Sequence, residues 1–286
     1  MNRNLVLLIG ALARTPELRY TPSGTAVLDM TIAGERSVIG ADGKSHTIPF
    51  YENVQALGKV AEAIVARGYE QGTALMVEGQ LDYSTWSTPE GEKRSMLRTK
   101  VTGSVRQIAG EPSLVTDAGG NVRLAGGMSQ VEFTGNLSAD VEVRYTPAGD
   151  AVADLRMAVN ERYRDRQNQP QEKTHWVTVT VWREQAEAVA NLRKGDAVFV
   201  QGALIDESWS DRDGNKRRQK KVEASLVVAL ARSATSGEGN ARTPARAAQP
   251  QRERAAATAA PAARSGGLDI DQGVDDFPAE EADLPF

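Results

Sequence analysis

The chain contains the stretch RYTPSGTAVLDM at residues 19–30 and repeats it as RYTPAGDAVADL at residues 144–155. Eight of the twelve positions are identical, at a constant offset of 125 residues. A period of this length is the size of a domain and too long for a solenoid repeat. Two copies of one module provide two copies of one surface. This favours a long, repetitive ligand over a single small substrate.

Length and composition indicate the general class of the protein. The chain has 286 residues, a length typical of two domains. It has no cysteine, which excludes disulfides and thiol nucleophiles and suits a reducing cytoplasm. No apolar run approaches the roughly 20 residues that cross a bilayer, and the N-terminal residues lack the apolar stretch of a signal peptide. We therefore expect a cytoplasmic protein without a membrane partner.

Negative charge is concentrated at the C-terminal end. The net charge is −4, but residues 268–286 hold seven Asp and Glu residues and no Lys or Arg. Removing these seven negative charges from −4 leaves +3 for residues 1–267. A weakly basic body with an acidic tail is typical of nucleic-acid-binding proteins.

The repeat and the composition divide the chain into five regions. The segment after the second copy is rich in Ala, Arg, Gln, Pro, Gly and Thr and has almost no large apolar side chains. It cannot bury enough surface to offset the entropy of ordering, so we predict disorder there. The regions are the first copy (1–109), a turn-rich joint (110–127), the second copy (128–232), the disordered linker (233–267) and the acidic tail (268–286).

Hydrophobic alternation predicts strands, most clearly from His175 to Trp182. The odd positions carry His175 and three valines, whereas the even positions carry two tryptophans and two threonines. A short helix is predicted after this strand in each copy, at residues 59–67 and 184–193. Five strands with one helix between the third and fourth match the OB-fold, a small Greek-key barrel. We therefore predict a mainly β protein of two tandem OB-fold barrels plus a disordered acidic tail.

Tryptophans on polar strand faces are candidates for stacking nucleobases. Trp176 and Trp182 share a face with two threonines, and Trp86 shares its face with polar side chains. Stacking on an exposed ring contributes about 1–3 kcal/mol per base and tolerates any sequence, because every base has a π-face. The alternative is that the rings are core or interface residues. For Trp209 this alternative has equal support, because two apolar residues share its face.

Cations accompany the aromatic rings of the second copy. A predicted loop carries Arg162, Tyr163, Arg164 and Arg166 in close succession. A second cluster begins the last strand and consists of Lys216, Arg217, Arg218, Lys220 and Lys221. These cations fall on both faces, so we expect a hairpin that projects beyond the barrel. They can contact phosphates and make binding depend on salt, or they can form an ordinary solvated face.

Further short motifs surround these residues. They are LRKGD at residues 192–196, VQGAL at 200–204, SW at 208–209 and DLPF at 283–286. Together with the repeated RYTPxGxAV stretch they resemble the bacterial single-stranded DNA-binding protein family, in the subgroup with two OB-folds per chain. The resemblance covers nearly the whole chain. It implies a nucleoid-associated homodimer that presents four OB-folds and protects single-stranded DNA in replication, recombination and repair.

The resemblance also assigns positions to the DNA contact. In the second copy the stacking aromatics fall on Tyr163, Trp176, Trp182 and Trp209. In the first copy they fall on Val38, Tyr51, Leu57 and Trp86, so two rings are missing. One basic position falls on Lys194 but on Gln71 in the first copy, and another falls on Lys59 but on Glu184 in the second. We predict that the second copy binds DNA more tightly.

The end of the chain is predicted to bind partner proteins. By the resemblance, the tip formed by Asp283, Leu284, Pro285 and Phe286 recruits replication and repair proteins. A tail that only aids solubility is the alternative, but such a tail gains nothing from exposed apolar residues. The terminal ring and carboxylate can instead enter one pocket flanked by basic groups on a partner.

One strand suggests where two subunits meet. The first copy contains LVLLI at residues 5–9, a continuous apolar run typical of a strand buried on both faces. Its counterpart, QVEFT at residues 130–134, alternates and looks half exposed. We therefore expect the first copy to carry more of the contact between subunits.

The sequence does not predict an enzyme, a cofactor or a metal site. Its two histidines, His46 and His175, are expected on the polar surface at loop-to-strand junctions. The DRDG stretch at residues 211–214 lacks the spacing of a calcium loop and is expected to be a turn. The alternative function is an adaptor whose barrels bind structured RNA and whose tail docks proteins, because OB-folds accept several ligand classes. A nuclease has little support.

Overall fold

The structure is a computed structural model that describes residues 3–40, 43–88, 91, 93–164, 167–210, 214 and 216–230. Five predictions lie wholly or largely outside the described residues: Arg166, the turn at 211–214, the side chain of Arg217, the linker at 233–267 and the acidic tail with its tip. Neither helix in the described part of the chain has the length and apolar character of a membrane span.

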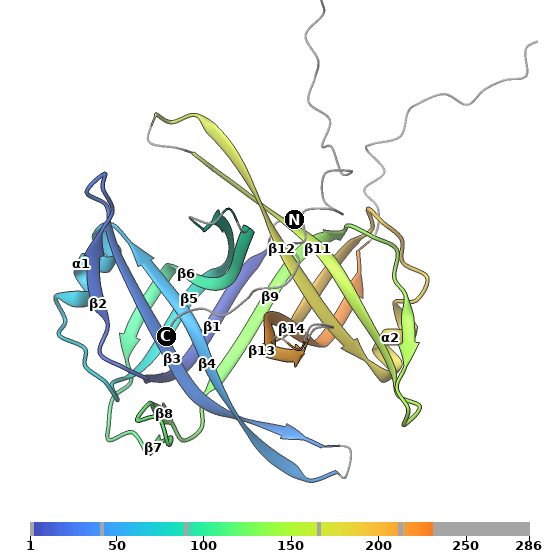
Figure 1. The fold of residues 1–286 in the computed structure, drawn as a ribbon, viewed down its shortest axis with the longest axis horizontal. Helices are drawn as coiled ribbons and strands as arrows, with labels where there is room; N and C mark the ends of the chain where they lie inside the picture. The colour runs from blue at the N-terminus through green and yellow to red at the C-terminus, as the bar shows by residue number, and fades with distance from the viewer. Residues whose placement is uncertain are drawn as a thin grey trace, which may run out of the picture.

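The first half of the chain forms a closed barrel, which we call barrel one (Figure 1). Its long strands pair in the order β1–β5–β6–β4–β3, and a further pairing of β1 with β3 closes the barrel. Among the pairings of these five strands, only that of β4 with β6 is parallel. This is the predicted five-stranded Greek-key arrangement. The elements are β1 (Asn4–Leu12), β2 (Glu17–Tyr20), β3 (Ala26–Ile39), β4 (Ser45–Leu57), α1 (Lys59–Val65), β5 (Ala74–Ser87) and β6 (Lys93–Gln107).

The second half repeats the arrangement as barrel two. Its strands pair in the order β9–β13–β14–β12–β11, and β11 returns to β9. The parallel pair is now β12 with β14. The short helix again follows the third long strand, as predicted. The elements are β9 (Met128–Leu137), β10 (Val143–Tyr145), β11 (Ala151–Arg164), β12 (Pro170–Trp182), α2 (Arg183–Ala188), β13 (Ala197–Ser210) and β14 (Lys216–Ala229).

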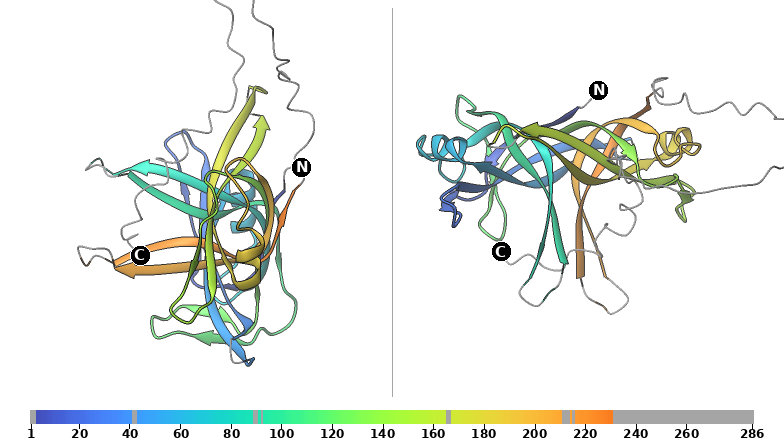
Figure 2. Two further views of the ribbon diagram at one scale, coloured as in Figure 1. Left: turned by 90° about the vertical axis from the view of Figure 1, so that its right-hand side faces the viewer. Right: turned by 90° about the horizontal axis from the view of Figure 1, so that it is seen from above.

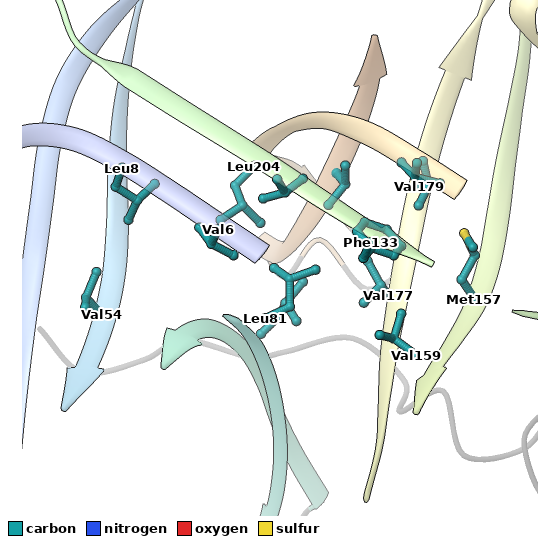
Figure 3. Packing of buried hydrophobic residues seen from close by; sticks show 14 of the residues in the cluster. Val6, Leu8, Val54, Leu81, Phe133, Met157, Val159, Val177, Val179 and Leu204 are labelled. Atoms are coloured by element: carbon teal, nitrogen blue, oxygen red, sulfur yellow. The ribbon is translucent and has the colours of Figure 1, made fainter. Parts of the chain in front are cut away.

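The two barrels are joined by their first strands. Strand β1 pairs antiparallel with β9, and Val6 lies opposite Val131. These two valines occupy the same position of the repeat, so the barrels are related by an approximate two-fold axis at this pair. Val6 is fully buried, and one cluster of buried apolar side chains runs through both barrels (Figure 3). On the other face of β1, Leu5, Leu7 and Ile9 are half-buried.

Contacts on β5 and β12 fix the barrels against each other. The backbone N–H of Tyr83 in barrel one donates to Nδ1 of His175 in barrel two over 3.0 Å. Nε2 of the same ring lies 3.0 Å from a carboxylate oxygen of Glu161. Lys173 reaches Asp82 at 2.5 Å. The prediction that His175 is a surface residue is therefore wrong, because the ring is fully buried at the barrel junction.

The joint between the barrels contains a hairpin that the sequence analysis did not predict. It consists of β7 (Leu114–Thr116) and β8 (Val122–Leu124), which pair antiparallel. Strand β8 also pairs with β3 at Gly34 and Leu124, so the hairpin lies against barrel one (Figure 1). Its alternating Leu-Val-Thr and Val-Arg-Leu runs, separated by glycines and asparagine, are a hairpin signal in the sequence.

Candidate nucleic-acid interface

Strand β12 presents its aromatic side chains to solvent. His175, Val177, Val179 and Val181 are fully buried, as the alternation predicts. On the opposite face Trp176 is half-buried and Trp182 is 40% exposed. The two rings are therefore not sealed inside the protein, which is the condition that base stacking requires.

Trp176 lies in an open groove of about 390 Å³ between the two barrels. Lys173 and Thr174 of β12 line it on one side. On the other side the groove is lined by barrel one, through Tyr83, Ser84 and Thr85 of β5. The sequence analysis missed these three residues, because only the packing of the barrels brings β5 against β12. A flat ring and hydroxyl groups suit a nucleobase, whereas the ammonium group of Lys173 is already paired with Asp82.

Two long hairpins, β5–β6 and β13–β14, project from the same side of the molecule (Figure 2). Each carries one of the predicted tryptophans near its tip. Trp86 is 40% exposed and faces Arg94 in the register, whereas Trp209 is half-buried and faces Arg217. Lys216 and Arg218 are exposed at the start of β14. The projecting hairpin predicted for the last strand is therefore present, and it has a counterpart in barrel one.

Two cations of the same cluster are structural. Nζ of Lys220 lies 2.9 Å from a carboxylate oxygen of Glu52 in barrel one and 3.1 Å from Asp206. Burial disfavours the charge on Lys220, but the two carboxylates outweigh it and hold the pKa of this ammonium above its usual value. Nζ of Lys221 lies 2.5 Å from Glu207. Lys220 and Lys221 thus fit neither of the two roles considered for the cluster, phosphate contact or a solvated face, because their charges are paired with carboxylates of the same chain.

Three of the four residues predicted in a loop, Arg162, Tyr163 and Arg164, instead lie at the end of strand β11, because β11 and β12 continue as a long hairpin. Arg162 is exposed, with its Nε 3.4 Å from Glu172, and the ring of Tyr163 is 46% exposed. Arg164 donates to the backbone oxygen of Asn168 at 2.9 Å. These residues lie on a long two-stranded ribbon that extends from barrel two (Figure 1).

Tyr51, at the position of Trp176 in the repeat, has a different environment. Its hydroxyl donates to a carboxylate oxygen of Asp117 in the β7–β8 hairpin over 2.8 Å. Burial and the neighbouring Asp117 raise the pKa of the tyrosine hydroxyl. Hydrogen bonds from Asn121 and Tyr51 lower the pKa of Asp117 to about 2. Tyr51 is thus half-buried and engaged by an acidic group of the same chain.

The remaining predicted positions also differ between the barrels. Leu57 is 37% exposed where barrel two has Trp182, so an apolar side chain without a ring faces solvent. Val38 is half-buried. Lys59 lines an open groove of about 710 Å³ together with Arg67 and Arg106.

The basic position occupied by Lys194 in barrel two is Gln71 in barrel one, and the two residues make different hydrogen bonds. Gln71 donates to the backbone oxygens of Ala13, at 2.8 Å, and Gly120, at 3.0 Å. Lys194, its counterpart in barrel two, is half-buried, and its backbone N–H donates to Asp140. Within the described ranges no three His, Cys, Asp or Glu side chains are grouped as metal ligands.

Comparison with known proteins identifies the relatives of this chain. The Single-strand binding protein family matches residues 3–106 and 128–230. A single-stranded DNA-binding protein of Deinococcus radiodurans is 50% identical, over 99% of this chain and 98% of the relative. One of Thermus thermophilus is 42% identical over the same shares. A crystal structure of a deletion mutant of the single-stranded DNA binding protein from Thermus aquaticus superposes with a TM-score of 0.64 at 32% identity, over 83% of this chain and 98% of that one.

Proposed function

The chain belongs to the single-strand binding protein family, and from this membership we propose that it binds single-stranded DNA without sequence preference and protects it in replication, recombination and repair. The observation that carries the proposal is the solvent-accessible pair of tryptophans on β12. Trp182 is 40% exposed, and Trp176 lines a groove that both barrels form. In a protein without such a ligand, burial of these rings would increase the stability of the fold.

Stacking and phosphate contact act together in the proposed binding mode. Bases stack on Trp176 and Trp182 of β12 and on Tyr163, Trp209 and Trp86 of the hairpins. Phosphates are contacted by Lys216, Arg217, Arg218, Arg162, Arg164, Arg166, Lys59 and Lys194. Each neutralised phosphate releases counterions, so affinity falls as the salt concentration rises. None of these contacts reads the edge of a base, which explains binding without sequence preference.

We further propose that two chains associate, so that the functional unit presents four barrels and acts on DNA at the nucleoid in the cytoplasm. The apolar side chains of Leu5, Leu7 and Ile9, half-buried in one chain, support a subunit contact through barrel one. The tip at residues 283–286 is proposed to recruit replication and repair proteins. Its acidic and apolar sequence supports this, because a basic pocket with an apolar floor would bind both.

Tryptophan fluorescence tests the proposal directly. The chain has four tryptophans, and the proposed contact uses all of them. Titration with oligo-dT should quench the emission strongly, and high salt should partly reverse the quenching because phosphate contacts are screened. A duplex of the same length should quench little, since its bases are already stacked.

Matched ligands separate the proposed function from its alternatives. A hairpin RNA that quenches more strongly than oligo-dT at equal concentration would support the adaptor that binds structured RNA. Cleavage of oligo-dT in the presence of Mg²⁺ would support a nuclease. Removal of residues 278–286 should leave oligo-dT affinity equal or slightly higher, because the acidic tail competes with DNA. Weaker binding after this deletion would contradict the proposed role of the tip.

A further inference from the structure

We propose that the β7–β8 hairpin occupies the single-strand path on barrel one and diverts the bound strand away from Tyr51. The proposal rests on the proposed function and specifies how the two barrels share one strand. It assigns a role to the joint, which connects the barrels but is longer than the connection requires. The backbone N–H of Ala125 donates to the oxygen of Ser113 at 2.8 Å, so the chain leaves the hairpin where it entered.

The hairpin engages two positions that correspond to proposed DNA contacts in barrel two. Tyr51 stands where the repeat has Trp176, and its hydroxyl donates to Asp117 at the turn of the hairpin. Gln71 occupies the position in barrel one that corresponds to Lys194 in barrel two. Its side-chain amide donates to the backbone oxygen of Gly120 in the same turn. One short segment therefore contacts two positions of barrel one whose counterparts in barrel two are proposed to bind DNA.

Further contacts fix the hairpin against barrel one. Nε of Arg123 lies 2.8 Å from a carboxylate oxygen of Glu35, and both side chains are only 18% exposed. Arg14 donates to the side-chain oxygen of Asn121 at 2.8 Å. Within the turn itself, the carboxylate of Asp117 accepts the backbone N–H groups of Gly119, at 2.8 Å, and Asn121, at 2.9 Å, so the turn is held in shape. The hairpin is thus anchored at several points along its length, and a bound strand would have to break these contacts to reach Tyr51.

The charge at the turn strengthens the exclusion. Asp117 is ionised at neutral pH, and hydrogen bonds from Asn121 and Tyr51 lower its pKa further, to about 2. A phosphate that approached Tyr51 would meet this carboxylate, and like charges repel. The guanidinium of Arg123 also interacts with the Tyr51 hydroxyl, but it is paired with Glu35. The hairpin therefore blocks the path both by its volume and by its charge. Barrel one is left with Trp86 on its projecting hairpin and with the basic groove beside Lys59.

Excision of the hairpin tests the proposal in the full chain. Because Ser113 and Ala125 are already hydrogen-bonded, residues 114–124 can be replaced by Asn-Gly, which favours a tight turn. We expect the excised protein to occlude more nucleotides of poly-dT per chain than the wild type does. Photo-crosslinking with oligo-dT that contains 5-iododeoxyuridine should label Tyr51 in the excised protein and not in the wild type.

Two point variants keep the test independent of the excision. Asp117→Asn removes the charge, whereas Tyr51→Phe removes the hydroxyl that donates to Asp117 and keeps the ring. Both should increase crosslinking at position 51 and tighten oligo-dT binding several-fold. Glu111→Gln is the matched control, because it removes one negative charge from an exposed position of the joint outside the hairpin. It should change the affinity less than Asp117→Asn does.

Other outcomes would overturn the inference. An unchanged occluded length after excision, or crosslinking of Tyr51 in the wild type, would show that the hairpin does not block the path. Weaker binding by the excised protein would show that the hairpin is part of the DNA surface. Failure of the wild type itself to bind oligo-dT would instead contradict the proposed function, so the two failures can be told apart.

Discussion

Barrel one and barrel two have the same strand order but present different surfaces. Barrel two exposes Trp182 where barrel one exposes Leu57, and its Trp176 lines an open groove where Tyr51 is held by Asp117. The strand order is set by buried alternating residues, which both copies retain. The ligand surface is set by side chains that the fold does not need, so it can change without loss of the barrel. The difference teaches that duplication of a fold does not preserve duplicate binding sites.

The largest expected effect concerns the buried ion pair between Lys220 and Glu52, whose counterpart positions across the two-fold axis are apolar. The repeat places Leu97 and Val177 at the positions of Lys220 and Glu52, so Lys220→Leu copies barrel one. This variant leaves Glu52, which is 2% exposed, without its partner. We expect a loss of about 3–5 kcal/mol in the free energy of unfolding, measured by denaturant titration.

A double variant is the control for this loss. Glu52→Val with Lys220→Leu replaces the pair by the residues of the other copy. It should recover most of the lost stability, because a well-packed apolar pair commonly replaces a buried ion pair without cost. If the single variant were as stable as the wild type, the pair would not hold the barrels together.

The next effect tests the unequal binding of the barrels. Trp182→Leu copies barrel one and should weaken oligo-dT binding by about 1–3 kcal/mol, the contribution of one stacked base, or about 5- to 150-fold in Kd. The reciprocal change, Leu57→Trp, adds a ring at an exposed position and should tighten binding. Fluorescence anisotropy of labelled oligo-dT measures both. Equal losses from Trp182→Leu and Leu57→Ala would remove the basis for the asymmetry.

We expect His175 to make the stability of the protein sensitive to acid. Barrel one has no such group at this position, because the repeat places Phe50 there. Burial lowers the pKa of His175 below its ordinary value of 6.5. As the pH drops through about 6.5, this histidine therefore binds a proton in the unfolded chain but stays neutral in the folded chain. The free energy of unfolding falls in this range, because the unfolded state binds more protons. Protonation of Nδ1 would also break the hydrogen bond from Tyr83.

The variant His175→Phe checks this expectation. It loses the hydrogen bonds to Tyr83 and Glu161, so at pH 8 it should be less stable by about 1–3 kcal/mol. Its deficit relative to the wild type should shrink as the pH is lowered to 5. Thermal unfolding at several pH values measures the difference. A deficit that is constant with pH would mean that another group causes the acid sensitivity.

The smallest expected effect concerns the start of the two helices. Arg183 adopts φ 53°, a left-handed conformation, whereas barrel one has Gly58 with φ 56° at this place. Arg183→Gly should relieve a strain of about 1–2 kcal/mol, partly offset by the flexibility of glycine and by the lost contact with Asp150. We expect the net gain in stability to stay below about 1 kcal/mol. Differential scanning calorimetry measures it, with Gly58→Ala as the destabilising counterpart.

The sequence was sufficient to predict the barrels and the solvent-accessible tryptophans of β12, although Thr178 and Thr180 between them are buried. Both follow from alternation within single strands, where a residue's neighbours in the chain decide which face it occupies. The burial of His175 and the pairing of Lys220 with Glu52 could not be predicted in this way. Glu52 and Lys220 are 168 residues apart in the chain, and no local pattern brings them together. The β7–β8 hairpin carried a local signal, but its contact with Tyr51 depends on how the joint folds back.

The antiparallel pairing of Val6 with Val131 has a consequence for how this protein can evolve. In a symmetric dimer of single-barrel subunits, every substitution would occur on both sides of the axis at once. Here the two sides are encoded separately, so a charge on one side can be matched by its opposite on the other. Covalent fusion thus relaxes the symmetry constraint and allows one half to specialise while the other retains its original task.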